Sequence, residues 1–342
     1  MIERSPIMVT GGAGFIGSHA CKALSAAGHL PVTLDDLSTG NRDAVKWGPL
    51  VVADLLDTQA VTAALQAHGV RMVMHFAASA YVGESMRDPA LYYQNNVGGM
   101  TSLLAACRAA HADKVILSSS CATYGIPEHM PVTEDTPQQP VNPYGRTKLI
   151  CEQMLQDYEA AYGIRHVALR YFNAAGADPE GELFECHDPE THLIPLALMA
   201  ASGLRGPLEV FGSDYPTRDG SCERDYIHVS DLARGHLLAA DYLERGGKSC
   251  ALNLGTGRGY TVLEVLDAIH QATGVKVPCR IAPRRAGDPP ALTADPSRAQ
   301  KVLGFRAACP DLVRIIRDAA PSFGLPPVPD NNGEEDNARI TV

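Results

Sequence analysis

The sequence lacks any apolar run that approaches the roughly 18 residues a membrane-spanning helix needs. Its 45% hydrophobic and 20% charged residues are ordinary for a globular protein. Residues 1–17 contain a short apolar run that enters a glycine motif without a small-residue cleavage site, which is typical of a first strand rather than a secretion signal. We therefore expect a cytoplasmic protein without membrane contacts.

Positive charge is also scarce. Lys and Arg together number 29 against 39 Asp and Glu, which gives a net charge of -10. This balance argues against broad electrostatic attraction to nucleic acid. An anionic ligand would need a few local basic residues instead.

Neither cysteine nor histidine forms a recognisable ligand pattern. The nine cysteines are scattered without a Cys-x-x-Cys pair, and their odd number is not typical of a disulfide framework. We expect them to be buried thiols in a reducing compartment. The twelve histidines show no His-x-x-x-His spacing with a carboxylate, so we predict no metal site.

What the first half does contain is a regular alternation of short apolar runs and helix-length stretches. The predicted strands are 6–10, 31–34, 50–53, 72–76, 114–117 and 166–169, and the predicted helices include 18–27, 58–68, 89–111 and 143–162. Strands that alternate with helices predict an α/β fold, a Rossmann-like doubly wound parallel sheet. Ligands bind at the carboxyl ends of strands in such a sheet.

The alternation breaks after residue 176, where polar loops rich in Gly, Pro and acidic residues begin. We predict a first domain over 1–176 with a returning piece near 225–250, where 225–243 has helical periodicity. A smaller mixed α/β domain would then comprise 177–224 and 251–320. The composition of 321–342 predicts a flexible tail.

A glycine motif lies between the first predicted strand and the first predicted helix. In Thr10-Gly-Gly-Ala-Gly-Phe-Ile-Gly17, glycines recur at 11, 14 and 17. Such spacing allows a tight turn, close approach of a pyrophosphate and close helix–strand packing. Asp35 ends the next strand, where a carboxylate accepts hydrogen bonds from a ribose diol and repels a 2′-phosphate. The motif therefore predicts an NAD site.

Tyr144 and Lys148 are four residues apart at the start of a predicted helix, so their side chains share one face. An ammonium beside a phenol stabilises the phenolate and favours a role for Tyr144 as general base. The run Ser118-Ser119-Ser120 ends a predicted strand and offers a hydroxyl that can share the proton of a substrate hydroxyl. Together with the nucleotide motif, this pattern indicates a hydride-transfer enzyme.

Several long segments carry a family resemblance, among them TGGAGFIGSH, HFAASAYVGES, SSSCATYG, NPYGRTK, LRYFNAAGADPEG and RDYIHVSDLA. Over nearly the whole chain, from Met8 to about Phe323, the sequence resembles the extended short-chain dehydrogenase/reductase family, and within it the UDP-sugar 4-epimerases. The resemblance implies an NAD-binding domain, a UDP-sugar-binding domain and a homodimer paired through helices of 89–111 and 144–162.

The resemblance also implies roles for individual residues. The catalytic residues would be Ser120, Tyr144 and Lys148. The cofactor-binding residues would be Gly11, Gly14, Phe15, Ile16, Gly17, Asp35, Asp36, Asp54, Leu55, Phe76, Ala77, Ala78, Asn96, Tyr144, Lys148 and Phe172. The substrate-binding residues would be Ser120, Asn173, His192, Leu193, Phe211, Arg224, Tyr226, Val262, Arg285, Asp288 and Leu292.

Related sugar-nucleotide dehydratases and decarboxylases carry acidic residues after the catalytic Ser or Thr, where this chain has Cys121 and Ala122. Dehydration and decarboxylation are therefore disfavoured. Some relatives have a Lys in the stretch matching 78–81 and a bulky Tyr at Leu292, and both are missing here. The expected substrate is a UDP-hexose, with a UDP-pentose or UDP-N-acetylglucosamine as alternatives. A non-catalytic nucleotide-sugar sensor is the rival of another class.

Overall fold

The computed structural model describes residues 5–285 and 288–328 of the chain. Its larger sheet has seven parallel strands in the order β10-β6-β5-β4-β1-β2-β3. These strands are β1 (Pro6–Thr10), β2 (Leu30–Asp35), β3 (Leu50–Val52), β4 (Met72–His75), β5 (Lys114–Ser120), β6 (Arg165–Tyr171) and β10 (Cys250–Leu254). The predicted doubly wound parallel sheet is confirmed.

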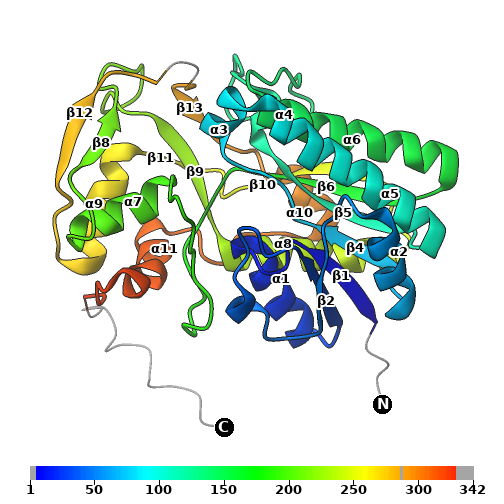
Figure 1. Ribbon diagram of the computed structural model, residues 1–342. Helices are drawn as coiled ribbons and strands as arrows, with labels where there is room; N and C mark the ends of the chain where they lie inside the picture. Colours follow the sequence, from blue (N-terminus) through cyan, green and yellow to red (C-terminus); the bar gives the residue numbers. More distant parts are fainter. Residues whose placement is uncertain (1–4, 286–287, 329–342) are drawn as a thin grey trace, which may run out of the picture.

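Helices cover both faces of this sheet (Figure 1). One face packs against α2 (Thr58–Ala67), α5 (Gly99–Ala110) and α6 (Pro143–Tyr162), and the other against α1 (Phe15–Ala26), α8 (Val229–Glu244) and α10 (Ser297–Leu303). Successive residues of a strand point to opposite faces, so Met8 joins the first apolar core whereas Ile7 and Val9 join the second. Because both faces are buried, the strands are almost continuously apolar.

The rest of the chain builds a smaller region, at the left of Figure 1. One sheet pairs β9 (Glu223–His228) with β7 (Asn173–Ala175), β11 (Gly259–Thr261) and β13 (Ala291–Leu292), and a second pairs β8 (Leu208–Phe211) with β12 (Cys279–Ala282). A third apolar core lies between these strands and α7 (Leu193–Ala201), α9 (Val262–Thr273) and α11 (Leu312–Ala319).

The predicted helix over 89–111 is interrupted. It consists of α4 (Pro89–Tyr92), a π-helical turn (Tyr93–Gly98) and α5. The π turn places Asn96, 2% exposed, where its side-chain oxygen accepts from the Ser79 amide at 2.8 Å and its amide nitrogen donates to the Thr147 hydroxyl at 3.0 Å. Such turns are frequent at functional sites, and this one ties the loop after β4 to α6.

The predicted helical character of 225–228 is wrong, because these residues belong to β9. The buried Asp225 carboxylate accepts hydrogen bonds from the backbone amides of Thr256, Gly257 and Ala294, which lie far away in sequence. Pairing with β7 and β11 then holds the strand extended. Helix α8 begins only after His228, whose side chain accepts from the Ser230 amide and caps it.

The sequence predicted that only residues near 225–250 return to the first domain, but β10 and α10 also pack on the larger sheet. Strand β10 is an edge strand of that sheet, and α10 packs on it together with the buried Phe305. The start of the predicted tail is ordered: Leu325 is 7% exposed, and the Val328 amide donates to the Ala272 carbonyl at 2.8 Å. Residues 329–342 lie outside the described residues. Among the described residues, no helix is both long and apolar enough to cross a membrane.

Candidate functional site

The turn between β1 and α1 requires glycine at two of the three motif positions. Gly11 has a φ of +71°, and a Cβ there would lie 2.6 Å from the Ala77 nitrogen. A Cβ on Gly17 would lie 2.2 Å from the Gly11 carbonyl oxygen. No side chain caps the N terminus of α1, and its first turn has no acidic residue. The first amides of this helix are therefore available to a phosphate, and the turn fits a dinucleotide.

Asp35 lies beside this turn, at the carboxyl end of β2. Its Oδ2 accepts from the Ala13 amide at 3.0 Å and its Oδ1 from the Leu37 amide at 2.9 Å. The side chain is 7% exposed. Burial raises the pKa of Asp35, and the two amide donors act in the opposite direction. The carboxylate is thus held in a fixed orientation next to the glycine turn, as a reader of the ribose diol requires.

The other predicted cofactor residues have mixed surroundings. The Asp36 and Asp54 carboxylates accept from amides of their own turns, at Ser38 and Leu56. Leu55 is part of an apolar core. The remaining predicted contacts after β4 and β6 lie at the carboxyl edge of the sheet, namely Phe76, Ala77, Ala78 and Phe172.

The predicted catalytic residues come from β5 and α6. Asn142 caps α6 by accepting from the Gly145 amide at 2.8 Å, which places Tyr144 in the first turn. Lys148, 4% exposed, donates from Nζ to the Ser118 carbonyl oxygen at 2.8 Å. Its Nζ lies 5.9 Å from the centre of the Tyr144 ring. The helix therefore holds the ammonium beside the phenol and against the strand that ends at Ser120.

Burial acts on both members of this pair. Burial, and then the neighbouring Tyr171, raise the pKa of Tyr144 well above its usual 10, while the Ser120 hydroxyl lowers it. Burial lowers the pKa of Lys148 to about 8. The ammonium is therefore still charged at neutral pH. Tyr144 needs this charge, together with any positive charge on a bound ligand, to become a base at neutral pH.

A buried ion pair that the sequence analysis missed supports this arrangement. Glu152 follows Lys148 by four residues on α6, and it accepts from the Arg170 guanidinium at 2.6 Å and from the Ser119 hydroxyl. Arg170 also donates to the Tyr124 hydroxyl at 2.9 Å. The ion pair links α6 to β5 and β6 directly behind Ser120. The four-residue spacing places Glu152 near Lys148 on α6, but its partner Arg170 lies on β6, so no local spacing in the sequence indicates the pair.

Two predicted substrate residues are cations with specific partners. Arg224 donates to the carbonyl oxygens of Glu223 and Pro289 and lies 3.9 Å from the Asp288 carboxylate. The guanidinium carbon of Arg285 lies 3.9 Å from the centre of the Phe211 ring. Within an acidic protein, such guanidinium groups suit a diphosphate and an aromatic base.

The other substrate candidates fall into two groups. Asn173 and Tyr226 are paired partners on β7 and β9, whereas Val262 begins α9 and packs against the third core. Leu292, 6% exposed, belongs to an apolar cluster with Phe172 and Cys121. This cluster joins the carboxyl ends of β5 and β6 to β13 of the smaller region.

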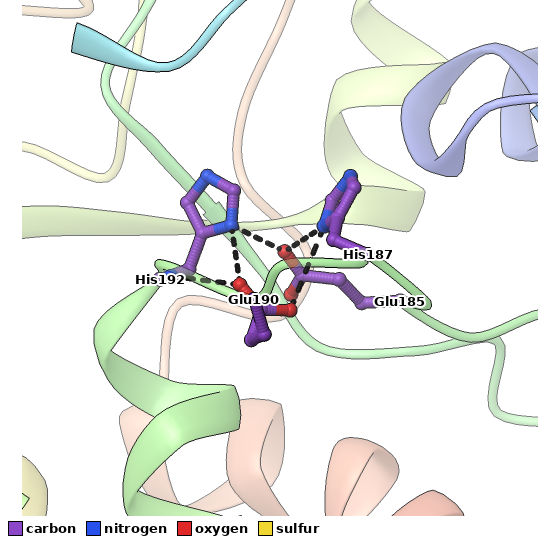
Figure 2. Close-up of side chains that lie close together, drawn as sticks. All are labelled: Glu185, His187, Glu190 and His192. Carbon is purple, nitrogen blue, oxygen red and sulfur yellow. Dashed lines mark hydrogen bonds and ion pairs between the residues drawn. The ribbon is translucent and has the colours of Figure 1, made fainter. Parts of the chain in front are cut away.

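His192 and Leu193 lie at the N terminus of α7. His192 Nδ1 lies 2.9 Å from Oε1 of both Glu185 and Glu190, and His187 faces the same carboxylates (Figure 2). Although burial opposes it, these carboxylates raise the pKa of His187 to about 9 and that of His192 to about 10. Of these four residues, only His192 was predicted as a site residue from the sequence.

Comparisons with known proteins agree with this geometry. The model of the NAD dependent epimerase/dehydratase family matches residues 7–255. The chain is 53% identical over 318 residues to the UDP-glucose 4-epimerase of Rhizobium meliloti (strain 1021), covering 93% of this chain and 97% of the relative.

Solved structures are similarly close. The UDP-glucose 4-epimerase of Brucella ovis, in complex with NAD, is 57% identical with a TM-score of 0.93, covering 95% of this chain and 100% of that one. The enzyme from Stenotrophomonas maltophila, with bound NAD and formylated UDP-arabinopyranose, is 40% identical with a TM-score of 0.91, covering 94% and 98%. The expected family resemblance is confirmed.

Proposed function

Because the chain belongs to the NAD dependent epimerase/dehydratase family, we propose that it inverts carbon 4 of a UDP-hexose and thereby interconverts UDP-glucose and UDP-galactose. The observation that carries the proposal is the Lys148 ammonium, held 5.9 Å from the Tyr144 ring centre beside the strand end at Ser120. Full-length relatives named for this reaction support it.

NAD is the cofactor; bound at the glycine turn, it would supply reversible hydride transfer at carbon 4 of the sugar. The glycine turn at 11–17 and Asp35 hold its phosphates and ribose. The remaining predicted cofactor residues complete this proposed site at the carboxyl edge of the sheet.

The chain's own residues move the proton. Tyr144 takes the proton of the 4-hydroxyl group, and Ser120 shares the hydrogen bond and stabilises the charge that develops on the oxygen. Lys148 favours the phenolate through its charge. After the keto sugar has turned over, Tyr144 returns the proton. The buried Glu152–Arg170 ion pair keeps α6 and β5 in register during this cycle.

Arg224 and Arg285 are proposed to hold the UDP part while the hexose turns. Arg224 lies on β9 of the smaller region, and Arg285 stacks on Phe211 at the end of β8. If the nucleotide is held firmly while the sugar pocket accepts more than one orientation, either face of carbon 4 can be turned towards the nicotinamide.

Loss of water or carbon dioxide is disfavoured by the residues after Ser120. Burial raises the pKa of Cys121 to about 12, so it stays a thiol at neutral pH. Ala122 has no titratable group. Neither residue supplies the additional acid and base that such eliminations require.

The decisive experiment is a substrate panel. Purified protein with NAD is incubated with UDP-glucose, UDP-galactose, their N-acetyl forms and UDP-xylose, and the products are separated by chromatography. We expect UDP-glucose and UDP-galactose to interconvert. Conversion confined to the pentose would favour that alternative, which the UDP-arabinopyranose bound by the Stenotrophomonas maltophila enzyme makes worth testing. Conversion of no sugar, with UDP-sugar still bound, would support the sensor.

We also propose that the protein is a cytoplasmic homodimer. All nine cysteines are free thiols, in keeping with a reducing compartment. The dimer surface would lie on α5 and α6, where Tyr162 is 50% exposed, next to the segment that holds Leu91, 43% exposed. A molar mass of one chain by light scattering at micromolar concentration would refute the dimer.

A further inference from the structure

Four side chains just before α7 converge on one small volume. Glu185, His187, Glu190 and His192 each direct one nitrogen or oxygen atom towards the others, and these four atoms all lie within 4.8 Å of one another (Figure 2). They come from eight consecutive residues. The two rings both present Nδ1 to the carboxylates, which leaves Nε2 of His192 free of the cluster.

The separations between the rings and the carboxylates are close to those of a tetrahedral zinc site. His192 Nδ1 lies 2.9 Å from Oε1 of Glu185 and 2.9 Å from Oε1 of Glu190. His187 Nδ1 lies 3.2 Å from Oε1 of Glu185 and 3.6 Å from Oε2 of Glu190. Zinc binds histidine nitrogen and carboxylate oxygen at about 2.0–2.1 Å, so the ligand atoms of a tetrahedral site are about 3.3 Å apart. The observed values lie on either side of that distance.

His187 supplies an independent observation. Its Nδ1 is buried and forms no hydrogen bond, although carboxylate oxygens lie 3.2 and 3.6 Å away. A nitrogen that served only as a donor to one carboxylate would point its N–H at one oxygen. Nδ1 of His187 instead faces one oxygen of each carboxylate, which is the position of a ligand to a cation that it shares with Glu185 and Glu190.

A divalent cation also satisfies the charge balance of the cluster. The Glu185 and Glu190 side chains are 5% and 8% exposed, and within the described part of the chain they pair with neither Lys nor Arg. Two buried carboxylates need compensating positive charge. Two imidazolium rings supply it when no metal is bound, and one divalent cation supplies the same charge when both imidazoles are neutral. A nearby acidic trio differs, because Lys22 Nζ lies 2.6–2.7 Å from Asp178, Glu180 and Glu182 and already supplies the cation.

We propose that Glu185, His187, Glu190 and His192 form a four-coordinate site for a divalent transition metal, with Zn²⁺ as the best fit. Four protein ligands leave no open position, so the ion is structural. It fixes the segment 185–192 at the start of α7. The rings of Phe15 and Tyr81 lie 6.3 and 6.2 Å from that of His187, so the ion would also hold this segment against the cofactor side of the molecule. The site does not depend on the proposed reaction.

The test is direct metal binding. Full-length protein is treated with a chelator, dialysed and titrated with ZnCl₂ by calorimetry, and metal content is measured by emission spectroscopy. We expect one equivalent per chain and a rise in Tm on adding Zn²⁺. Glu185→Gln and His187→Ala should each remove the bound equivalent and the Tm response, whereas Glu180→Gln, from the acidic trio, should keep both.

Substitution with Co²⁺ reports the geometry, because four-coordinate Co²⁺ has intense visible absorption bands. Absence of saturable Zn²⁺ binding by the unmodified chain would overturn the proposal, and the four side chains would then be two imidazolium–carboxylate pairs. Binding that persists in both Glu185→Gln and His187→Ala would also overturn it, as would the weak spectrum of octahedral Co²⁺. Circular dichroism of each variant shows whether it is folded, and the near-isosteric Glu185→Gln keeps the test valid if His187→Ala does not fold.

Discussion

Lys148→Met tests the central electrostatic claim about the site. The substitution removes the ammonium and keeps an unbranched side chain of similar length. In the structure Nζ lies 5.9 Å from the centre of the Tyr144 ring. The pKa of Lys148 is lowered only to about 8, so at neutral pH the substitution removes a full positive charge from the surroundings of the phenol.

The expected magnitude follows from that distance. If the 5.9 Å from Nζ to the ring centre is taken as the separation of the two charges, an effective dielectric constant of about 20 gives an interaction of about 2.8 kcal/mol. This energy corresponds to about 2 pKa units. The pKa of Tyr144 should therefore rise by about 2 units in the variant. At a fixed pH below that pKa, the phenolate fraction and kcat should fall about 100-fold.

The assay is kcat at saturating UDP-glucose and NAD as a function of pH. We expect the limb of the profile that rises with pH to move upward by about 2 units in Lys148→Met. Lys148→Arg keeps the charge and should move it much less. Because the Ser118 carbonyl loses its donor, the Met variant should also lose about 1–3 kcal/mol of stability, so kcat must be measured below its Tm.

An unshifted profile would refute the reasoning. If kcat falls but the pH at which kcat rises is unchanged, Lys148 only positions ligands and does not set the pKa of Tyr144. If kcat remains within a few-fold of the unmodified enzyme, neither role holds.

Four further predictions concern single residues. Tyr144→Phe should lower kcat by about 10²–10⁴-fold and leave NAD and UDP affinities nearly unchanged, because it removes only the base; turnover close to that of the unmodified enzyme would exclude Tyr144 as the base. Asp35→Ala should weaken NAD binding more than NADP binding, measured on protein stripped of cofactor, and an unchanged preference would show that Asp35 does not read the ribose. Leu292→Tyr overfills an apolar cluster at a cost of about 1–3 kcal/mol. If Leu292 borders the sugar, the variant should lower kcat/KM for UDP-N-acetylglucosamine relative to that for UDP-glucose by about five- to a hundred-fold. An equal loss of activity on both substrates, with a lower Tm, would leave Leu292 only a packing role. Burial, and then the Lys148 charge, lower the pKa of His75 to about 3. Between about pH 6.5 and 3 the unfolded state therefore binds one more proton than the folded state, and the free energy of unfolding falls as the pH falls. When urea unfolding is measured at pH 7 and at pH 5, the free energy of unfolding of His75→Asn should fall by about 2 kcal/mol less than that of the unmodified chain, and equal losses would contradict the lowered pKa.

Three features could be predicted from the sequence alone, because each depends only on the spacing of nearby residues. They are the glycine turn after β1, the shared helix face of Tyr144 and Lys148, and the alternation of strands and helices. Glycines three residues apart at a strand end and a Tyr-x-x-x-Lys on a helix depend only on neighbouring backbone geometry. The doubly wound sheet follows from the same alternation, and its confirmation shows that hydrophobic period is enough to predict fold class here.

Tertiary structure decided the features that depend on distant partners. The π turn at Asn96 bonds to Ser79 and Thr147, and the strand that replaces the predicted helix at 225–228 is held by amides some 30 and 70 residues further along. Long-range hydrogen bonds override local periodicity in both places. Glu185, His187, Glu190 and His192 lie within eight residues of one another, but their spacing matches neither a helix nor a strand, so only the conformation of the folded loop brings them together.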